Sequence, residues 1–400
     1  MSSPVQHQHE APRRRWYVPM LSRDTTESHR AATPLELFFD LCFVVAVAIA
    51  SAELHHDIAE GHGGEGVRAF TLSFFAIWWA WMNFTWFASA YDTDDGVYRL
   101  TTFVQMAGVL VLAAGIPRAF ESTDLGLMTY GYVVMRLAMV TQWLRAAQSD
   151  GETRPCALRY AAGVASVQVL WVARLAVPEE WNIPSILVLI AAELLVPVYA
   201  ERAARTAWHP HHIAERYGLF TIIVLGESIL AATLAFQEAF DADGGEEAAL
   251  IALAISGLVV VFSMWWLYFD QADHPEPGSF RAAFSWGYGH LFIFASAAAV
   301  GAAIALTVDH KTDHTEISDT VAGLVIAAPV AVYLAAVWLI HVLPGHDRGV
   351  LVLAFPACAL LALASTLLGT WALPAVALLL AGLVTLMLLQ RAHAASASAP

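Results

Sequence analysis

The feature that most constrains this chain is a series of long apolar segments. Near the C-terminus, Val350–Leu368 and Leu373–Leu389 contain no Asp, Glu, Lys or Arg. A helix of about 20 apolar residues is long enough to cross the hydrocarbon core of a bilayer. Charged residues make up only 14% of the chain and hydrophobic residues 58%, too few charges to cover the surface of a water-soluble protein of this size. We therefore predict an all-α polytopic membrane protein.

Apolar segments follow one another along the whole chain and are joined by short connections. The predicted spans are residues 35–54, 68–91, 100–119, 126–146, 157–177, 182–200, 212–236, 249–269, 283–307, 321–343, 350–369 and 372–390. This pattern predicts about 12 transmembrane helices, with the lipid bilayer as the surrounding partner and no separate soluble domain. It predicts no particular oligomeric state.

The positive residues are distributed unevenly between the two sides of these spans. If the N-terminus is cytoplasmic, fifteen arginines lie on the cytoplasmic side, and only three arginines and one lysine lie on the opposite side. Cytoplasmic loops of membrane proteins carry an excess of Lys and Arg. We therefore predict that both termini are cytoplasmic.

Corresponding residues recur in the two halves of the chain. The pairs are Glu36 with Glu215, Trp78 with Trp265 and Arg99 with Arg281, at offsets of 179, 187 and 182 residues. Matches in the same order predict two six-span parallel repeats. The predicted regions are a polar cytoplasmic N-terminal segment (1–34), a first six-helix repeat (35–200), an inner linker (201–211), a second six-helix repeat (212–390) and a cytoplasmic tail (391–400).

Ionisable residues inside the spans need a partner or a role, because each costs roughly 2.5–3.5 kcal/mol at the centre of a span. Glu36 and Asp40 are four residues apart and share one helix face. Four further residues of one predicted span fall within an arc of about 120°. We predict that the substrate or ion pathway contains Glu36, Asp40, His212, Glu215, Arg216, Glu227 and His290. Salt bridges that only hold helices together are the alternative for Glu36, Asp40 and Glu227.

Other polar residues have a simpler interpretation. Arg136 and Glu193 fall at similar depths, which predicts a structural ion pair. Two further sets are predicted to form latches between the inner loops and the spans: Asp94 with Arg99, and Asp270 with Arg281. His290 is predicted either to form ordinary hydrogen bonds or to relay protons.

Several classes of function are disfavoured. A net charge of −15 leaves no basic surface for nucleic acid. Cys42, Cys156 and Cys358 are too few and too scattered for a disulfide framework. In His209-Pro-His211-His212, Pro210 separates two histidines from the helix, and no second ligand set completes a metal site. We therefore expect no metal and no cofactor.

Five segments of the sequence are similar to those of a known family. They are Pro34-Leu-Glu-Leu-Phe-Phe-Asp-Leu, Trp78–Asp95 with Arg99, His212–Ser228, Trp266-Leu-Tyr-Phe-Asp and Tyr288-Gly-His290. In these stretches the chain resembles the bacterial low temperature requirement protein A (LtrA) family over residues 30–390. The resemblance implies an integral protein of the bacterial inner (plasma) membrane with a role in growth at low temperature. A more distant likeness, to the endolysosomal potassium and proton channels, rests on Asp40, but the second half has Leu219 in place of such an Asp.

The resulting prediction is a transporter or channel for a small cation or a proton-coupled solute. Glu36, Asp40, Glu215 and Glu227 would be the coordinating or protonatable groups, and Arg216 would adjust their charge. The alternatives are an intramembrane enzyme acting on a lipid or quinone through His212, Glu215 and His290, or a membrane scaffold. An enzymatic activity is the less favoured of these.

Overall fold

The computed structural model describes residues 16–23, 31–122, 124–241, 247–271, 280–344 and 349–397, and within these residues it is helical without any β-strand. The helices of the first half are α1 (Pro34–Ala59), α2 (Gly63–Tyr91), α3 (Gly96–Glu121), α4 (Gly126–Ser149), α5 (Arg154–Arg174) and α6 (Asn182–Glu201). Those of the second half are α7 (Pro210–Asp241), α8 (Glu247–Phe269), α9 (Phe280–Lys311), α10 (Asp319–Val337), α11 (Leu351–Ala364) and α12 (Ala372–Ala397). The predicted all-α class is confirmed.

Nine helical stretches in the described part of the chain are long and apolar enough to cross a membrane. They include α1, α3 and α5 to α10, while α11 and α12 form one continuous apolar stretch, Leu351–His393. α2 and α4 are not among them. Lengths and composition therefore indicate a multi-pass membrane protein, as the apolar segments predict.

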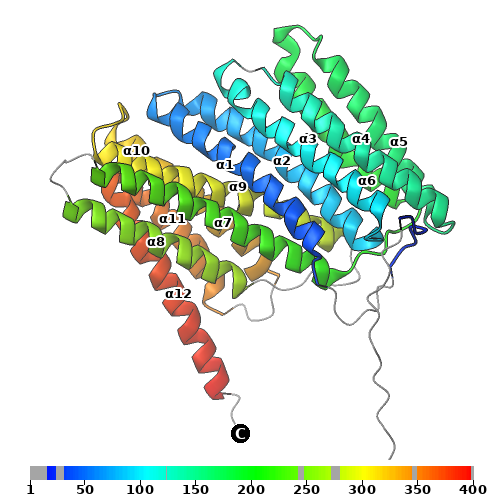
Figure 1. Cartoon of the computed structure of the whole chain (residues 1–400). Helices are drawn as coiled ribbons and strands as arrows, with labels where there is room; N and C mark the ends of the chain where they lie inside the picture. The colour runs from blue at the N-terminus through cyan, green and yellow to red at the C-terminus, as the bar shows by residue number, and fades with distance from the viewer. Residues whose placement is uncertain are drawn as a thin grey trace, which may run out of the picture.

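α1 occupies the middle of the bundle. It packs against its neighbours α2 and α3 and also against α7 and α9 of the second half. Figure 1 shows α1 to α6 on one side of the molecule and α7 to α12 on the other, with α1 and α7 between them. Polar residues on the facing sides of α1 and α7 are therefore removed from the surface.

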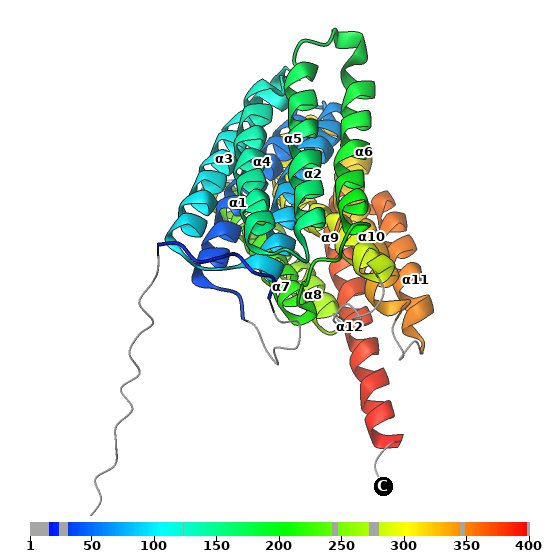
Figure 2. The same cartoon turned by 90° about the vertical axis from the view of Figure 1, so that its right-hand side faces the viewer.

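Residues 16–23 and the end of α12 lie at the same end of the bundle, and α12 extends beyond the other helices (Figures 1 and 2). Residues 16–23 lie across the ends of α2, α3 and α4. Arg23 N donates to Ala90 O at 3.0 Å, and Val97 N donates to Trp16 O at 3.2 Å. We call this side of the bundle the terminal end.

The close contact between α3 and α4 depends on glycine. A Cβ atom on Gly131 of α4 would collide with the backbone of Leu112 and Gly108 on α3. Small residues let helix backbones approach closely, which favours van der Waals packing between helices in lipid. Gly131 therefore sets the separation of these two helices.

Candidate functional site

Four ionisable side chains from α1 and α7 meet inside the bundle, and all four are 0% exposed. Arg216 donates to both oxygens of Asp40, with Nε 3.0 Å from Oδ2 and Nη2 2.5 Å from Oδ1. Its Nη1 lies 3.1 Å from Glu36 Oε1, and His212 Nε2 lies 3.0 Å from the same oxygen. We call Glu36, Asp40, His212 and Arg216 the α1–α7 charge cluster.

The local sequence explains how α1 presents its two acids. Thr33 is the N-cap of α1, and Pro34 occupies the first turn, where its missing N–H costs nothing. Thr33 Oγ1 accepts from Glu36 N at 3.2 Å, and Glu36 Oε2 accepts from Thr33 N at 2.7 Å, which completes a capping box. Asp40 follows one turn later on the same face. Glu36 therefore caps the helix with one oxygen and faces α7 with the other.

The surroundings of the cluster exclude water and fix its geometry. The indole Nε1 of Trp81, from α2, donates to Asp40 Oδ1 at 2.7 Å. The Phe84 ring lies 5.9 Å from the Arg216 guanidinium carbon. Two carboxylates face one guanidinium, so the cluster is electrically neutral only when His212 or one carboxyl group carries a proton. Buried ionisable groups in membrane proteins need such partners, because an unpaired charge inside the bundle is costly.

Three predicted pathway residues lie outside this cluster: Glu215 and Glu227, on α7, and His290, on α9. Glu215 is partly exposed, and its Oε2 accepts from Ala32 N at 3.1 Å, so it holds the chain just before α1. Glu227 lies further along α7, is partly exposed, and has no hydrogen bond or ion pair with any residue that the structure describes. The structure therefore brings together four of the seven predicted pathway residues.

Arg136 and Glu193 form a second buried group, in the first half. Arg136 Nη2 donates to Glu193 Oε2 at 2.9 Å, and the two side chains are 2% and 0% exposed. Three further donors satisfy Glu193: Trp79 Nε1 at 3.0 Å, Tyr132 Oη at 3.0 Å and Gln168 Nε2 at 2.9 Å. Four donors to one carboxylate make this a rigid connection between α2, α4, α5 and α6.

His290 of α9 belongs to a third buried group. Its Nδ1 donates to Trp286 O at 2.7 Å, so the Nε2 of the neutral ring accepts from Tyr268 Oη at 3.0 Å. His341 lies beside it, with ring centroids 5.3 Å apart, and is 3% exposed. Neither ring nitrogen of His341 has a hydrogen-bond partner in the described part of the chain.

His341 is a functional candidate that the sequence analysis missed. It lies in a short π-helix, Trp338–Val342, that follows α10. Such turns are rare and frequently occur at functional sites. The signal was available, since His341 is an ionisable residue within the predicted span 321–343, as His290 is within its own span.

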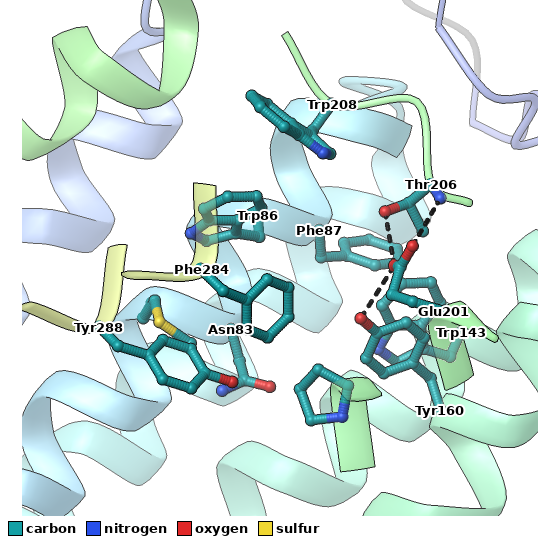
Figure 3. A pocket seen from close by; sticks show the side chains of 12 residues that line it. Asn83, Trp86, Phe87, Trp143, Tyr160, Glu201, Thr206, Trp208, Phe284 and Tyr288 are labelled. Carbon is teal, nitrogen blue, oxygen red and sulfur yellow. Dashed lines mark hydrogen bonds between the residues drawn. The ribbon is translucent and has the colours of Figure 1, made fainter. Parts of the chain in front are cut away.

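An aromatic pocket of about 40 Å³ opens between the two halves near the terminal end. Figure 3 shows the rings of Trp86, Trp143, Tyr160 and Tyr288 around it, with the single carboxylate of Glu201 at one side. Glu201 accepts from Tyr160 Oη at 3.0 Å and from Thr206 Oγ1 at 2.7 Å. Glu201 is the one formally charged residue among those that line this pocket.

The aromatic pocket is connected to the buried groups through side chains. Trp86 Nε1 donates to Tyr217 Oη at 3.0 Å. The Tyr217 ring lies 4.9 Å from both the Trp81 ring, which contacts Asp40, and the His290 ring. An aromatic wall thus separates the pocket from the α1–α7 charge cluster on one side and from His290 on the other.

The predicted loop latches differ in their partners. Asp94 and Arg99 form a bidentate pair, with both bonds 2.7 Å long, that ties the α2–α3 loop to the first turn of α3. Asp270 Oδ1 accepts from Arg391 Nη1 of α12 at 2.7 Å. The backbone of Arg281 lies in α9, but its side chain is outside the described residues.

A buried ion pair that spacing did not reveal lies at the terminal end. Asp95 is the N-cap of α3 and pairs with Arg145 of α4. Burial by itself raises the pKa of Asp95, but the Arg145 hydrogen bond and the backbone N–H groups of Tyr98 and Val18 outweigh this and hold the pKa below its ordinary value. Arg145 also donates to Val18 O at 2.6 Å, so the pair anchors residues 16–23.

Similarity to known proteins extends over nearly the whole chain. A family model described as "Bacterial low temperature requirement A protein (LtrA)" matches residues 31–389, from just before α1 into α12. A relative from Rhizobium meliloti (strain 1021), named "Uncharacterized protein RA0937", is 29% identical over 308 residues, which is 71% of this chain and 71% of that protein. Within the described residues, no group of three or more His, Cys, Asp or Glu side chains is arranged to hold a metal ion.

Proposed function

Because this chain belongs to the bacterial low temperature requirement A protein (LtrA) family, and because its apolar helices enclose ionisable side chains, we propose that it transports protons or a small cation across a membrane. The observation that carries the proposal is the α1–α7 charge cluster, in which two carboxylates face one guanidinium and one imidazole. Ionisable residues buried in membrane proteins are expensive and mark ion or proton pathways by default.

The cluster has the charge properties of a coupling site. With His212 neutral and both carboxyl groups ionised it carries one negative charge, and one proton or one monovalent cation restores neutrality. His212 is the natural group for the proton, since histidine changes charge most readily near neutral pH. Arg216 stays charged throughout and holds Asp40 in place. The exchange of charge is therefore assigned to His212 and Glu36.

We propose that the aromatic pocket is the access route from the terminal end. Rings of Trp and Tyr attract cations through their faces, and Glu201 supplies one negative charge. Movement of the Trp86–Tyr217 contact would connect the pocket to Trp81 and the cluster behind it. His290 and His341 would extend the path along α9, while Glu215 positions the chain before α1 and Glu227 offers a carboxylate further along α7.

The finer features of the architecture belong to the same proposal. We propose twelve spans in two six-span parallel repeats, residues 35–200 and 212–390. An inner linker, 201–211, joins the repeats, and the segments 1–34 and 391–400 flank them. The helix pairs support it, because α1 packs on α3 as α7 packs on α9, and α3 packs on α4 as α9 packs on α10. The residues at both ends of the described chain lie at the terminal end, which fits cytoplasmic termini in a bacterial inner membrane.

Reconstitution into liposomes containing a pH-sensitive dye tests the proposal. Protein-containing liposomes should dissipate an imposed pH gradient, or a potassium or sodium gradient under a matched potential, faster than protein-free liposomes. His212→Gln keeps a hydrogen-bond donor near Glu36 but cannot take up a proton, so it should abolish the proton flux. Equal gradient decay with and without the protein, for all three ions, would show that the proposal is wrong.

The matched control is His56→Gln. His56 lies at the opposite end of α1, is 64% exposed and contacts Glu60. This variant should transport like the original chain. A role in growth at low temperature is a separate part of the proposal, tested by whether the transport-deficient His212→Gln variant restores cold growth to a strain that lacks the gene.

A further inference from the structure

A cavity of about 270 Å³ lies at the end of the bundle opposite the terminal end, within the first half. It is formed where α2 and α6 begin and where α3 and α5 end. One water molecule needs roughly 10–15 Å³, so the cavity has room for a chemical group much larger than water. It is separate from the α1–α7 charge cluster and from the aromatic pocket.

The cavity contains a buried arginine that has no counter-ion among the described residues. Arg174, the last residue of α5, is 6% exposed and lines the cavity. Its Nη2 donates to Asn182 Oδ1 at 3.0 Å, but its Nε has no hydrogen-bond partner among the residues that the structure describes. It forms no ion pair with any carboxylate in the described part of the chain. A buried charge without a partner costs several kcal/mol, so an anion in the cavity would stabilise it.

Other features of the cavity agree with an anionic group. Asn182 begins α6, and the N-terminal end of a helix favours negative charge. Arg68, which is itself exposed, adds a second guanidinium at the rim. Two carboxylates, Glu65 and Glu121, also line the rim, but both are exposed, so water screens them. The buried charge inside is positive.

A second cavity of about 50 Å³ lies next to the first, closer to the middle of the bundle. The two share Leu72, Leu125 and Ile186 as lining residues. The second cavity is lined almost entirely by apolar side chains, including Ala76 and Trp171. A chamber with a buried guanidinium beside an apolar one matches an amphiphile with an anionic head and a hydrocarbon chain.

We propose that these adjacent cavities bind an anionic phospholipid of the surrounding bilayer. The phosphate pairs with Arg174 and Arg68 at the start of α6, and part of one acyl chain enters the apolar cavity beside Ala76. The bilayer is the source because the cavity lies at one end of the apolar helices, at the depth where phosphate groups meet hydrocarbon. The site belongs to the first half of the molecule and acts independently of proton or cation transport.

The test uses the purified full chain, delipidated in a neutral detergent. Phosphatidylglycerol and phosphatidylcholine with identical acyl chains are titrated separately, and the Tm is followed, since a ligand of the folded state raises it by mass action. Oleate and inorganic phosphate are titrated in parallel. Phosphatidylglycerol should raise the Tm saturably and at lower concentration than the other three.

Two variants and a control identify the site. Arg174→Gln should weaken phosphatidylglycerol binding by on the order of tenfold, the effect of losing charge-assisted hydrogen bonds. Ala76→Phe fills the apolar cavity but leaves Arg174 in place, so it should weaken phosphatidylglycerol binding and leave the response to inorganic phosphate unchanged. Arg118→Gln removes an exposed arginine at the same end of the bundle, outside the cavity, and should bind like the original chain.

Several outcomes would overturn the proposal. Equal stabilisation by phosphatidylglycerol and phosphatidylcholine would show that the head-group charge is not recognised. Stronger stabilisation by oleate would assign the site to a fatty acid, and equal stabilisation by inorganic phosphate would assign it to a simple anion. Unchanged phosphatidylglycerol binding by both Arg174→Gln and Ala76→Phe would place the lipid elsewhere.

Discussion

Arg216 and Asp40 form a bidentate ion pair across α7 and α1, between residues 176 positions apart in the sequence. Both side chains are fully buried, and Trp81 occupies a further acceptor site on Asp40. The geometry is that of the strongest carboxylate–guanidinium contacts in proteins. In this position the pair connects the two halves of the molecule.

Removal of one partner of this pair should be costly. Asp40→Asn removes the carboxylate that accepts two hydrogen bonds from the buried Arg216, and we expect a loss of about 3–5 kcal/mol in the free energy of unfolding. Denaturation of the purified protein in detergent measures it. The double variant Asp40→Asn with Arg216→Gln should regain most of the loss.

The exposed pair Asp94–Arg99 provides the matched control, because it has the same bidentate geometry. Asp94→Asn should change the free energy of unfolding by less than about 1 kcal/mol. Equal losses in Asp40→Asn and Asp94→Asn would mean that burial does not strengthen the Arg216–Asp40 pair.

The hydrogen bonds to Glu193 should also contribute to stability. Tyr132→Phe removes one donor to this buried carboxylate, so we expect a loss of about 1.5–3 kcal/mol, the usual value for a hydrogen bond to a charged group. Tyr130→Phe, at a position 55% exposed on the same helix, should change stability by less than about 0.5 kcal/mol. Thermal unfolding of both variants decides whether Tyr132 acts through Glu193.

The surroundings of two glycines, Gly131 of α4 and Gly226 of α7, predict opposite effects of substitution by alanine. Gly131→Ala should destabilise the protein by about 1–3 kcal/mol, because the new Cβ meets the backbone of Leu112. Gly226→Ala in α7 meets nothing within 4 Å and should stabilise it by up to about 1 kcal/mol through helix propensity. A stable Gly131→Ala variant would show that the two helices can separate without cost.

The attachment of residues 16–23 should depend on pH through Asp95. Its pKa in the folded protein is lower than the unfolded value of about 3.9, so its stabilising contribution is complete above that value and is lost as the pH falls through the lower folded pKa. Hydrogen exchange of this segment, corrected for intrinsic rates, should show protection at neutral pH that disappears only below about pH 4.

Asp95→Asn serves as the control for this pH dependence. The amide cannot form the ion pair with Arg145, so protection of residues 16–23 should be weak at every pH. Protection that disappears near pH 6 instead would indicate control by a histidine and would contradict the assignment to Asp95.

The helical class and the family could be predicted from the sequence because both depend on local features, namely long apolar segments and short motifs. Spacing also placed Glu36 with Asp40, and His212 with Arg216, on single helix faces. That these two faces meet depends on the rotation of α1 against α7, which spacing within one helix does not determine. The same reason explains why the Asp95–Arg145 pair and the contact of His341 with His290 were not predicted.

The proposed repeat shows another limit of sequence patterns. Trp78 and Trp79 of α2 are buried at about 1% and 0% exposure, whereas Trp265 and Trp266 of α8 are 45% and 42% exposed. The paired residues have the same spacing, but α2 lies among other helices and α8 lies at the edge of the bundle. Similar sequence in two halves therefore does not imply similar surroundings.

Glu36 combines two tasks that are usually performed by different residues. One oxygen holds the first turn of α1 through Thr33, while the other lies beside Arg216 and His212. Neutralisation of Glu36 would therefore loosen the start of the helix as well as change the charge of the cluster. In the proposed transport cycle, the backbone at residues 31–33 would report the protonation of Glu36, and a spectroscopic probe there would detect that change from the terminal end.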